Sequence, residues 1–112
     1  MEYQVKDSGK RVKYASGAVR DVEEDKIRWD LIPLEALERV AIHYTKGAKK
    51  YGDDNWKKGV PDKRLRRSLL RHTIQELLGQ TDEDHKAAIV FNALALIYNE
   101  EMGISIQDET ID

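Results

Sequence analysis

The most apolar stretch of the chain, residues 87–98, is flanked by signals that start and stop a helix. Thr81 followed by Asp84 resembles a capping box with Asp in place of Glu, and Gly103 stands where a glycine commonly ends a helix. All residues of the stretch but one are apolar, which is typical of a helix covered on several sides. The pattern predicts a buried helix of about six turns.

The polar exception in this stretch is an asparagine. It lies on a face whose positions follow one another at alternating steps of three and four, and the alanines on either side leave shallow spaces beside its amide. Two interpretations are open: the amide contacts a small polar ligand, or it ties the helix to a neighbour by a buried hydrogen bond. The positions of this face are His85, Ala88, Asn92, Ala95 and Asn99.

A second helical pattern covers residues 62–78. Arg64, Arg67 and Arg71 form a cationic stripe on one of its faces, and His72 lies beside the last of them. The stripe could meet phosphates, or it could pair with the acidic residues that open the next helix. Because only a short link follows, the two helices should form an antiparallel hairpin.

A shorter helical pattern begins with Pro33 and is expected to end at Gly47. Glu35 and Glu38 lie one turn apart on it, where paired carboxylates could hold Mg²⁺ or simply form a solvated face.

Residues 47–59 are too rich in glycine and charge for a regular element, and we expect an ordered loop with aromatic anchors.

This loop combines chemistry that suits a nucleotide. Asn55 offers an amide, Trp56 a flat stacking surface, and Lys49 and Lys50 offer cations. Base stacking on an aromatic ring and charge-assisted contacts to phosphate are the two contacts that such a ligand needs.

The N-terminal residues 1–14 alternate apolar and polar side chains around Asp7–Gly9, which predicts a short β-hairpin; a floppy N-terminus is equally open. The stretch SGAVRD follows as a turn, in which glycine permits close backbone approach and Arg20 supplies a forked donor. In the extended stretch KIRWDLIP, Arg28 is held between apolar neighbours and could bind phosphate, or pair with Asp30.

Length and composition narrow the class of protein. With 112 residues, 40% hydrophobic and 36% charged, the chain suits one domain with a modest core and a polar surface. No apolar run approaches the roughly 20 residues of a membrane span and no segment resembles a signal peptide, so we expect a cytoplasmic protein without a membrane partner. The net charge of −2 argues against a nucleic-acid polymer as partner.

A resemblance to a known family is carried by motifs in order: SGAVRD, KIRWDLIP, ALERVAIHY, GAKKYGDDNW, the Arg71–His72 pair, and DEDHKAA followed by FNALAL. Over roughly residues 16–101 the chain resembles small phage and prophage proteins labelled dATP/dGTP diphosphohydrolase N-terminal domain, which implies kinship with MazG-like all-α nucleotide pyrophosphohydrolases. It is also similar to the phage anti-Thoeris sponge family, small helical oligomers that hold cyclic ADP-ribose isomers, and in some cases cyclic trinucleotides, away from the host's defence effector.

The two families imply different chemistry. A MazG-like enzyme holds Mg²⁺ with E-x-x-E on one helix and E-x-x-D on the next. Glu35 and Glu38 match the first half, but after Asp84 the third helix has no acid until Glu100, so the second half is missing. As an enzyme, the protein would hold its Mg²⁺ cofactor with Glu35, Glu38 and Asp84.

A sponge needs no metal and no catalytic residue. It needs arginines for a pyrophosphate, a flat side chain for a base and amides for ribose hydroxyls, all in a buried interface. The resemblance and this chemistry together imply a nucleotide-derived small-molecule ligand, bound by Gly17, Ala18, Arg20, Arg28, Asn55, Trp56, Arg71, His72, His85 and Asn92.

We therefore expect a single all-α domain over residues 1–112, with a long antiparallel helical hairpin, a shorter helix before it, an irregular N-terminal arm over 1–15 with a short β-hairpin, and a frayed polar tail over 104–112. The apolar surface of the third helix predicts a homo-oligomer, either a dimer or a trimer of dimers. Sequestration of nucleotide second messengers is the preferred function, Mg²⁺-dependent dATP/dGTP pyrophosphohydrolysis is the alternative, and a structural or interaction protein is the third interpretation.

Overall fold

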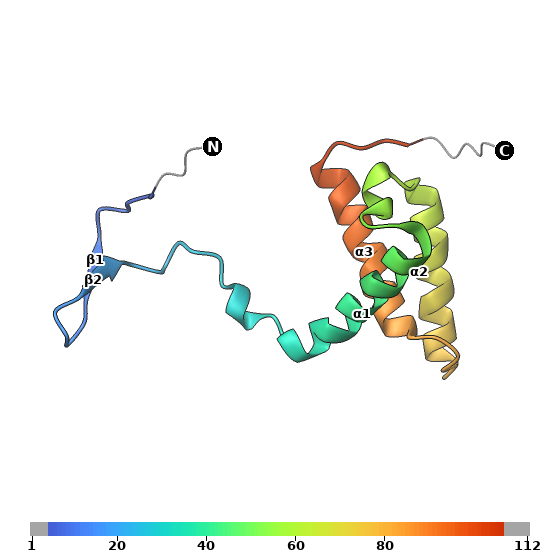
Figure 1. Cartoon of the computed structure of the whole chain (residues 1–112), viewed down its shortest axis with the longest axis horizontal. Coiled ribbons are helices and arrows are strands. Elements are labelled where there is room, and N and C mark those ends of the chain that lie inside the picture. Colours follow the sequence, from blue (N-terminus) through green and yellow to red (C-terminus); the bar gives the residue numbers. More distant parts are fainter. Residues whose placement is uncertain (1–4, 107–112) are drawn as a thin grey trace. The chain divides into compact units, whose positions relative to one another are not determined.

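The structure is a computed structural model that describes residues 5–106 and divides into two units, one ending at Ile32 and the other beginning at Pro33. The first unit holds a two-stranded hairpin and the second holds three α-helices (Figure 1). This confirms the predicted mostly helical fold with a short N-terminal hairpin. Within the described residues, none of the helices combines the length and the hydropathy needed to cross a membrane.

The helical unit consists of three α-helices and one short 3-10 helix. Helix α1 spans Leu34–Tyr51, the 3-10 helix η2 spans Asn55–Lys58, α2 spans Asp62–Leu77 and α3 spans His85–Glu101. Helices α2 and α3 pack against each other along their length, and α1 packs on α3 (Figure 1).

Helix α1 is longer than the sequence pattern predicts. The expected end at Gly47 is wrong, because a glycine in a helix interior destabilises it by only about 1 kcal/mol and does not break it. The helix continues for another turn, in which Lys49 and Lys50 complement the negative end of the helix dipole. It ends at Gly52, whose φ of 93° lies in a region that glycine adopts without steric cost.

Helix α3 begins later than predicted. Thr81 lies outside the helix, and Asp84 is itself the N-cap residue, with its carboxylate accepting a hydrogen bond of 3.2 Å from the backbone N–H of Ala87. The predicted capping box between Thr81 and Asp84 is therefore wrong, because Asp84 itself supplies the side-chain oxygen that caps the helix. The helix ends at Glu101 with Met102 as its C-cap, and Gly103 follows at the predicted position, with a φ of 63° and its backbone N–H donating to the carbonyl oxygen of Glu100 at 3.2 Å.

Helices α2 and α3 form the predicted antiparallel hairpin. All positions of the small and polar face of α3 are buried, so the face identified in the sequence is the packing face. Two asparagines on it hydrogen-bond the preceding helix: Asn92 donates to Ser68 Oγ at 3.2 Å, and Asn99 donates to a carboxylate oxygen of Asp62 at 2.8 Å. These bonds satisfy amides that would be costly to bury without partners.

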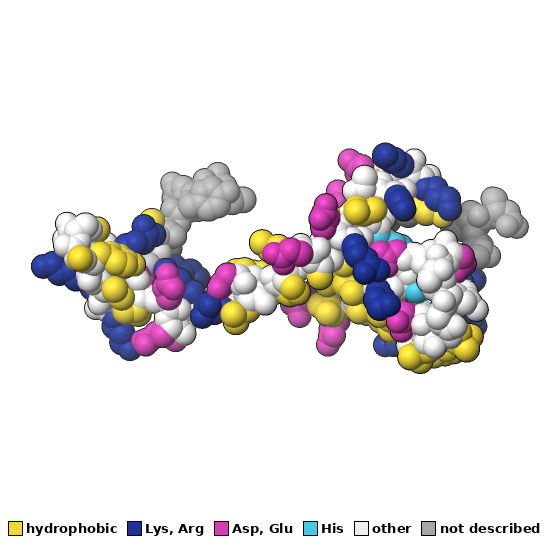
Figure 2. Space-filling model, turned by 90° about the horizontal axis from the view of Figure 1, so that it is seen from below, with side chains coloured by type: hydrophobic (Ala, Val, Ile, Leu, Met, Phe, Trp, Pro, Cys, Tyr) yellow, Lys and Arg dark blue, Asp and Glu magenta, His cyan; other side chains and the backbone are white. Residues whose placement is uncertain are grey.

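The hydrophobic core of the described helical unit is small. Its buried apolar residues are Val40, Leu65 and three alanines of α3. Larger apolar side chains stay accessible, and Leu77 retains 77% of its surface. Figure 2 shows hydrophobic side chains gathered at the surface of the helical unit. Apolar patches of this kind mark interaction surfaces on soluble proteins.

The N-terminal hairpin pairs β1, Arg11–Lys13, with β2, Val19–Asp21, in antiparallel register. The predicted turn at Asp7–Gly9 is wrong, because the chain reverses after β1, where Tyr14 N donates to Ala18 O at 2.8 Å. Gly17 in this turn has a φ of 91°, which glycine adopts readily. Part of SGAVRD is thus a strand.

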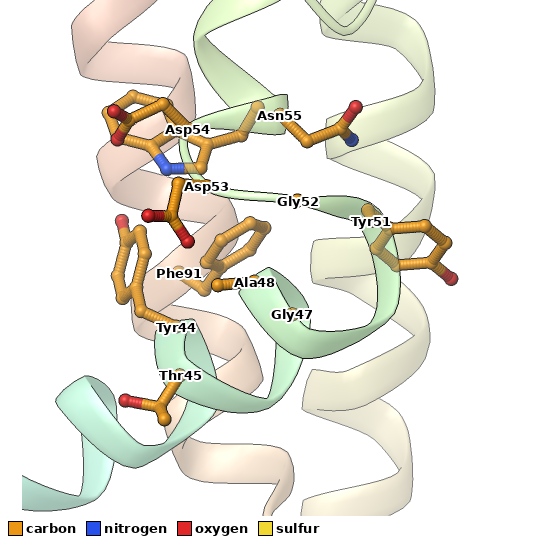
Figure 3. Close-up of a pocket in the computed structure, with 11 residues that line it drawn as sticks. Tyr44, Thr45, Gly47, Ala48, Tyr51, Gly52, Asp53, Asp54, Asn55 and Phe91 are labelled. Atoms are coloured by element: carbon orange, nitrogen blue, oxygen red, sulfur yellow. The ribbon is translucent and has the colours of Figure 1, made fainter.

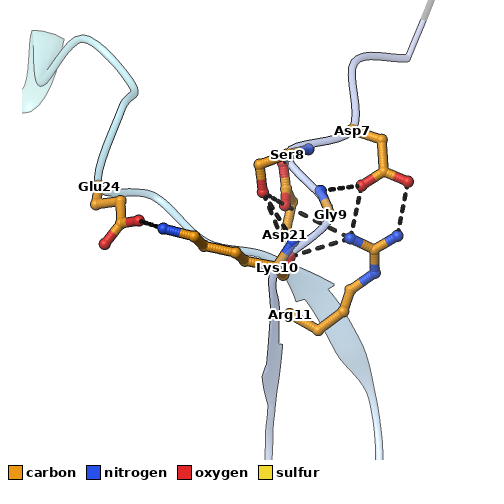
Figure 4. Close-up of polar contacts among 7 residues, drawn as sticks. All are labelled: Asp7, Ser8, Gly9, Lys10, Arg11, Asp21 and Glu24. Atoms are coloured by element: carbon orange, nitrogen blue, oxygen red, sulfur yellow. Dashed lines mark hydrogen bonds and ion pairs between the residues drawn. The ribbon is translucent and has the colours of Figure 1, made fainter.

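Polar contacts before β1 tie the hairpin together (Figure 4). Arg11 donates to both carboxylate oxygens of Asp7, at 2.7 and 2.8 Å, and Ser8 Oγ donates to Asp21. The guanidinium holds the pKa of the Asp7 carboxyl well below its usual range. The residues predicted to form a hairpin turn thus brace the two strands instead.

The stretch KIRWDLIP is not extended throughout as predicted. Trp29–Leu31 forms a 3-10 helix, η1, because backbone hydrogen bonds close tight turns there. Arg28 donates two hydrogen bonds to Asp30, at 2.8 and 2.7 Å. Of the two interpretations of Arg28, the surface ion pair with Asp30 is therefore present in the structure. Residues 107–112 of the predicted tail over 104–112 lie outside the described residues, as do residues 1–4 of the N-terminal pattern.

Candidate functional site

An aromatic hollow of about 320 Å³ lies between the C-terminal half of α1, the following loop and α3. Tyr44 from α1 and Phe91 from α3 point toward each other with ring centroids 4.9 Å apart, and the Asp53 carboxylate lies beside them (Figure 3). Asn55 and Trp56 complete the wall. The hollow therefore offers flat apolar surfaces with polar groups at its rim.

The loop after α1 places the indole of Trp56 in this wall. Asp54 adopts a left-handed backbone conformation with a φ of 57°, and η2 follows it directly. The Trp56 ring then packs edge-on against Tyr98 at 4.8 Å and against Tyr44 at 5.8 Å. The prediction of an ordered loop with an aromatic anchor is confirmed for Trp56, whereas the ring of Tyr51 is 62% exposed.

A second hollow, of about 450 Å³, adjoins the first and shares Gly47 and Tyr51 with it. Its α1 wall carries basic side chains at alternating steps of four and three, and its other wall carries the acids that precede α3. The basic side chains are Arg39, His43, Lys46 and Lys50.

Electrostatics in the second hollow are set by one close ion pair. Arg39 donates two hydrogen bonds to Asp84, at 2.9 and 2.6 Å. This guanidinium lowers the pKa of the Asp84 carboxyl to about 2. Burial lowers the pKa of His43, so its imidazole is neutral at neutral pH. Lys46 and Lys50 are exposed cations on the same wall.

The acids that a MazG-like enzyme would use are not assembled. Glu35 and Glu38 are exposed on the first turns of α1, and Asp84 is held by Arg39. Within residues 5–106, neither glutamate belongs to a group of three or more potential metal ligands. In the described part of the chain, Asp84 is therefore paired with a guanidinium and is not grouped with Glu35 and Glu38.

The predicted binding residues fall into separate places. Four of them belong to the N-terminal unit: Gly17 and Ala18 in the hairpin turn, Arg20 in β2 and Arg28 beside η1. Asn55 and Trp56 line the aromatic hollow, and Asn92 lies between α2 and α3. The remaining three, Arg71, His72 and His85, meet where α2 leads into α3.

These last three residues form a chain of polar contacts. Arg71 lies 3.5 Å from His72 Nε2, the Nδ1 atoms of His72 and His85 lie 2.8 Å apart, and His85 Nε2 lies 2.9 Å from Asp82. His85 and Tyr98, which contacts Trp56, are 13 positions apart on α3, or about 20 Å along the helix. The histidine cluster and the Trp56 wall are thus distinct sites.

Sequence reasoning missed several lining residues. Arg39 and Lys46 were missed because each alone looks like a solvated helix position, although the steps of four and three from Arg39 to Lys50 would have identified one cationic face. Tyr44 and Phe91 also line the aromatic hollow, although in the sequence each fits an ordinary packing position of its helix. Aromatic side chains at helical spacing do not reveal which of them line a hollow.

Comparison with known proteins identifies the family. The family model described as dATP/dGTP diphosphohydrolase, N-terminal, matches residues 16–109. No curated protein and no solved structure matches the chain significantly. The matched segment covers β2 of the hairpin and all three helices, and it begins after β1. The chain therefore belongs to the dATP/dGTP diphosphohydrolase N-terminal family.

Proposed function

We propose that this protein binds a nucleotide-derived ligand and sequesters it without cleavage. Cyclic ADP-ribose isomers are the preferred ligands, with cyclic oligonucleotides as further ones. The setting is the host-cell cytoplasm, where a phage-encoded protein would withdraw such second messengers from the defence effector. This setting follows from the resemblance of the sequence motifs to the sponge family.

One observation carries the proposal: the aromatic hollow adjoins a second hollow with a basic α1 wall, and the two share Tyr51. A base can stack on an aromatic ring, which contributes about 1–3 kcal/mol per base. Phosphate oxygens can accept charge-assisted hydrogen bonds from Lys46 and Lys50. The two hollows together, of about 320 and 450 Å³, are within the range of small-molecule sites.

The arrangement of the acids supports binding without hydrolysis. Phosphoryl chemistry of the MazG type requires Mg²⁺ ions held by several carboxylates. Both carboxylate oxygens of Asp84 accept hydrogen bonds from Arg39, and one of them also accepts the capping bond from Ala87. The residues that would hold Mg²⁺ therefore do not fit that role in this arrangement.

The family match favours a second function, which we keep as the alternative. The model that matches is described as a dATP/dGTP diphosphohydrolase. Under this alternative, Glu35, Glu38 and Asp84 would hold Mg²⁺ and the bound nucleotide would be cleaved. Release of Asp84 from Arg39 would have to precede metal binding.

We further propose that the protein acts as a homo-oligomer, a dimer or a trimer of dimers. Exposed apolar side chains on the described helices support this proposal. Two-fold association would present each such patch to its own copy.

A direct experiment separates the two functions. The protein is incubated with dGTP, dATP or a cyclic ADP-ribose isomer, with and without Mg²⁺, and is then denatured and the nucleotides are chromatographed. We expect the cyclic ligand to be retained by the folded protein and released intact, and dGTP and dATP to stay uncleaved. Recovery of dGMP or dAMP only in the presence of Mg²⁺ would overturn the proposal in favour of the enzyme.

A further inference from the structure

Two buried imidazoles face each other where α2 leads into α3. His72 and His85 are 6% and 3% exposed, and their Nδ1 atoms lie 2.8 Å apart. Neither hollow of the proposed nucleotide site includes His72 or His85 among its lining residues. The two rings share a buried hydrogen bond between their Nδ1 atoms, and the nucleotide proposal does not use this pair.

The outer contacts of this pair fix which nitrogens face each other. His85 Nε2 lies 2.9 Å from an oxygen of Asp82, so this nitrogen carries the proton and donates to the carboxylate. Nδ1 of His85 is then left with a lone pair, which accepts a hydrogen bond from the Nδ1–H of His72, so a metal ion bound here would displace that proton. A carboxylate on the remote ring nitrogen is the contact that orients metal-binding histidines and increases their basicity.

A third ligand group lies beside the two imidazoles. Glu83 is exposed, and one carboxylate oxygen of Glu83 and one ring nitrogen of each histidine all lie within 4.8 Å of one another. Within residues 5–106, this is the one group of three or more side chains so placed. Two imidazoles and one carboxylate make a ligand set that zinc accepts, whereas Mg²⁺ prefers oxygen ligands alone.

We propose that His72, His85 and Glu83 bind one divalent transition-metal ion, for which zinc is the natural probe. Tetrahedral zinc with Zn–N bonds of about 2.0–2.1 Å places two nitrogens about 3.3 Å apart, so the rings need to separate by about half an ångström. The fourth position is left to water, because His85 lines an open hollow of about 430 Å³.

The surrounding charges permit this ion. Lys86 is paired with Glu76 at 2.8 Å, and the exposed Arg71 lies 3.5 Å from His72 Nε2, the ring nitrogen that does not face His85. Asp82, which contacts His85 Nε2, and Glu83, which lies beside both histidines, add two negative charges next to the proposed ion. An ion held here links the C-terminal half of α2 to the first turn of α3, so it stabilises the helical hairpin by binding only to the folded state.

Calorimetric titration of the full, untagged chain with zinc chloride, after dialysis against a chelator, tests this proposal. We expect one zinc per chain, and an increase in melting temperature with zinc that a chelator reverses. Glu83→Gln should weaken zinc binding at least tenfold, and His72→Gln should abolish it. Glu100→Gln, which removes an exposed carboxylate from the other end of α3, should bind zinc like the natural sequence.

The Glu83 variant keeps the test decisive if His72→Gln does not fold, since Glu83 is exposed. Absence of stoichiometric zinc binding by the natural sequence would overturn the proposal. Equal zinc affinity in the natural sequence and in Glu83→Gln would also overturn this ligand set. The result is independent of nucleotide binding, because neither measurement includes a nucleotide.

Discussion

Asn92 Nδ2 of α3 lies 3.2 Å from Ser68 Oγ of α2, and the same amide donates to the carbonyl oxygen of Ala88 at 2.8 Å. Asn92 is 4% exposed. Of the two interpretations that the sequence left open for this amide, the buried hydrogen bond between helices is present in the structure. The contribution of this hydrogen bond to stability can be measured separately from any contribution of the Asn92 amide to ligand binding.

We predict that Asn92→Ala lowers the free energy of unfolding by about 1–3 kcal/mol, because a buried polar partner is left unsatisfied and packing is lost. Ser68→Ala should have a smaller effect, because the amide keeps the Ala88 carbonyl. Urea denaturation measures both changes. Unchanged stability in Asn92→Ala, together with tenfold weaker binding of a cyclic ADP-ribose isomer in calorimetry, would instead place this amide in the ligand site.

The second prediction concerns Asp84, which both caps α3 and pairs with Arg39. Asp84→Ala should destabilise the protein by about 1 kcal/mol through loss of the cap, and Asp84→Asn should have a smaller effect because an amide oxygen still caps the helix. Thermal denaturation at neutral pH compares the two variants. Equal destabilisation by both would show that the charge, and not the cap, matters.

The same carboxylate gives a pH dependence with a defined sign. Its pKa is lowered from 3.8 to about 2 in the folded protein, so the unfolded chain binds the proton more readily. The stabilisation is therefore present above pH 3.8 and is lost as the pH falls toward 2. In Asp84→Asn, this part of the acid destabilisation should disappear.

A third prediction tests the ring shared by the two hollows. Tyr51→Ala should weaken binding of a cyclic ADP-ribose isomer by about tenfold, because a stacking surface for the base is removed. The melting temperature should hardly change, since the ring is 62% exposed. Tyr14→Ala, which removes a 46% exposed ring from the hairpin, is the matched control. Full affinity in Tyr51→Ala would remove this ring from the site.

The fourth prediction is that the protein is not a monomer at micromolar concentration. Leu70, Ile74 and Leu77 recur at steps of four and three on α2 and are 62%, 47% and 77% exposed. Light scattering should give at least twice the 12.9 kDa chain mass. Ile74→Glu should reduce the measured mass and Gln80→Glu should not. A mass near that of one chain for the natural sequence would contradict the prediction.

The sequence predicted the helical hairpin well because its signals are local. The steps of three and four from His85 to Asn99 identified the buried face of α3, since helical period and side-chain size decide that face. Helix ends were less well predicted: Gly47 is tolerated inside α1, and Asp84 replaces Thr81 as the cap. A change of cap residue, or a glycine inside a helix, alters the free energy of the helix by only about 1 kcal/mol. A sequence pattern does not resolve differences of this size, so it does not fix where a helix ends.

The site was harder to predict than the fold. Trp56 was identified because a large aromatic in a glycine-rich loop needs a packing partner, and Tyr98 is that partner. The pairing of Arg39 with Asp84 joins residues 45 positions apart, and the crossing of α1 over α3 that creates it has no local sequence signal. The same holds for the contact between His72 and His85, which depends on the register of the hairpin.

The account rests most on the claim that the acids of α1 do not hold a catalytic metal. The measurement that tests it most directly is pyrophosphate release from dGTP in the presence of Mg²⁺, for the natural sequence and for the double variant Glu35→Gln, Glu38→Gln. We predict release at the level of a protein-free blank for both proteins. Mg²⁺-dependent release by the natural sequence that is lost in the double variant would contradict the account, because removal of Mg²⁺ ligands abolishes turnover only in an enzyme.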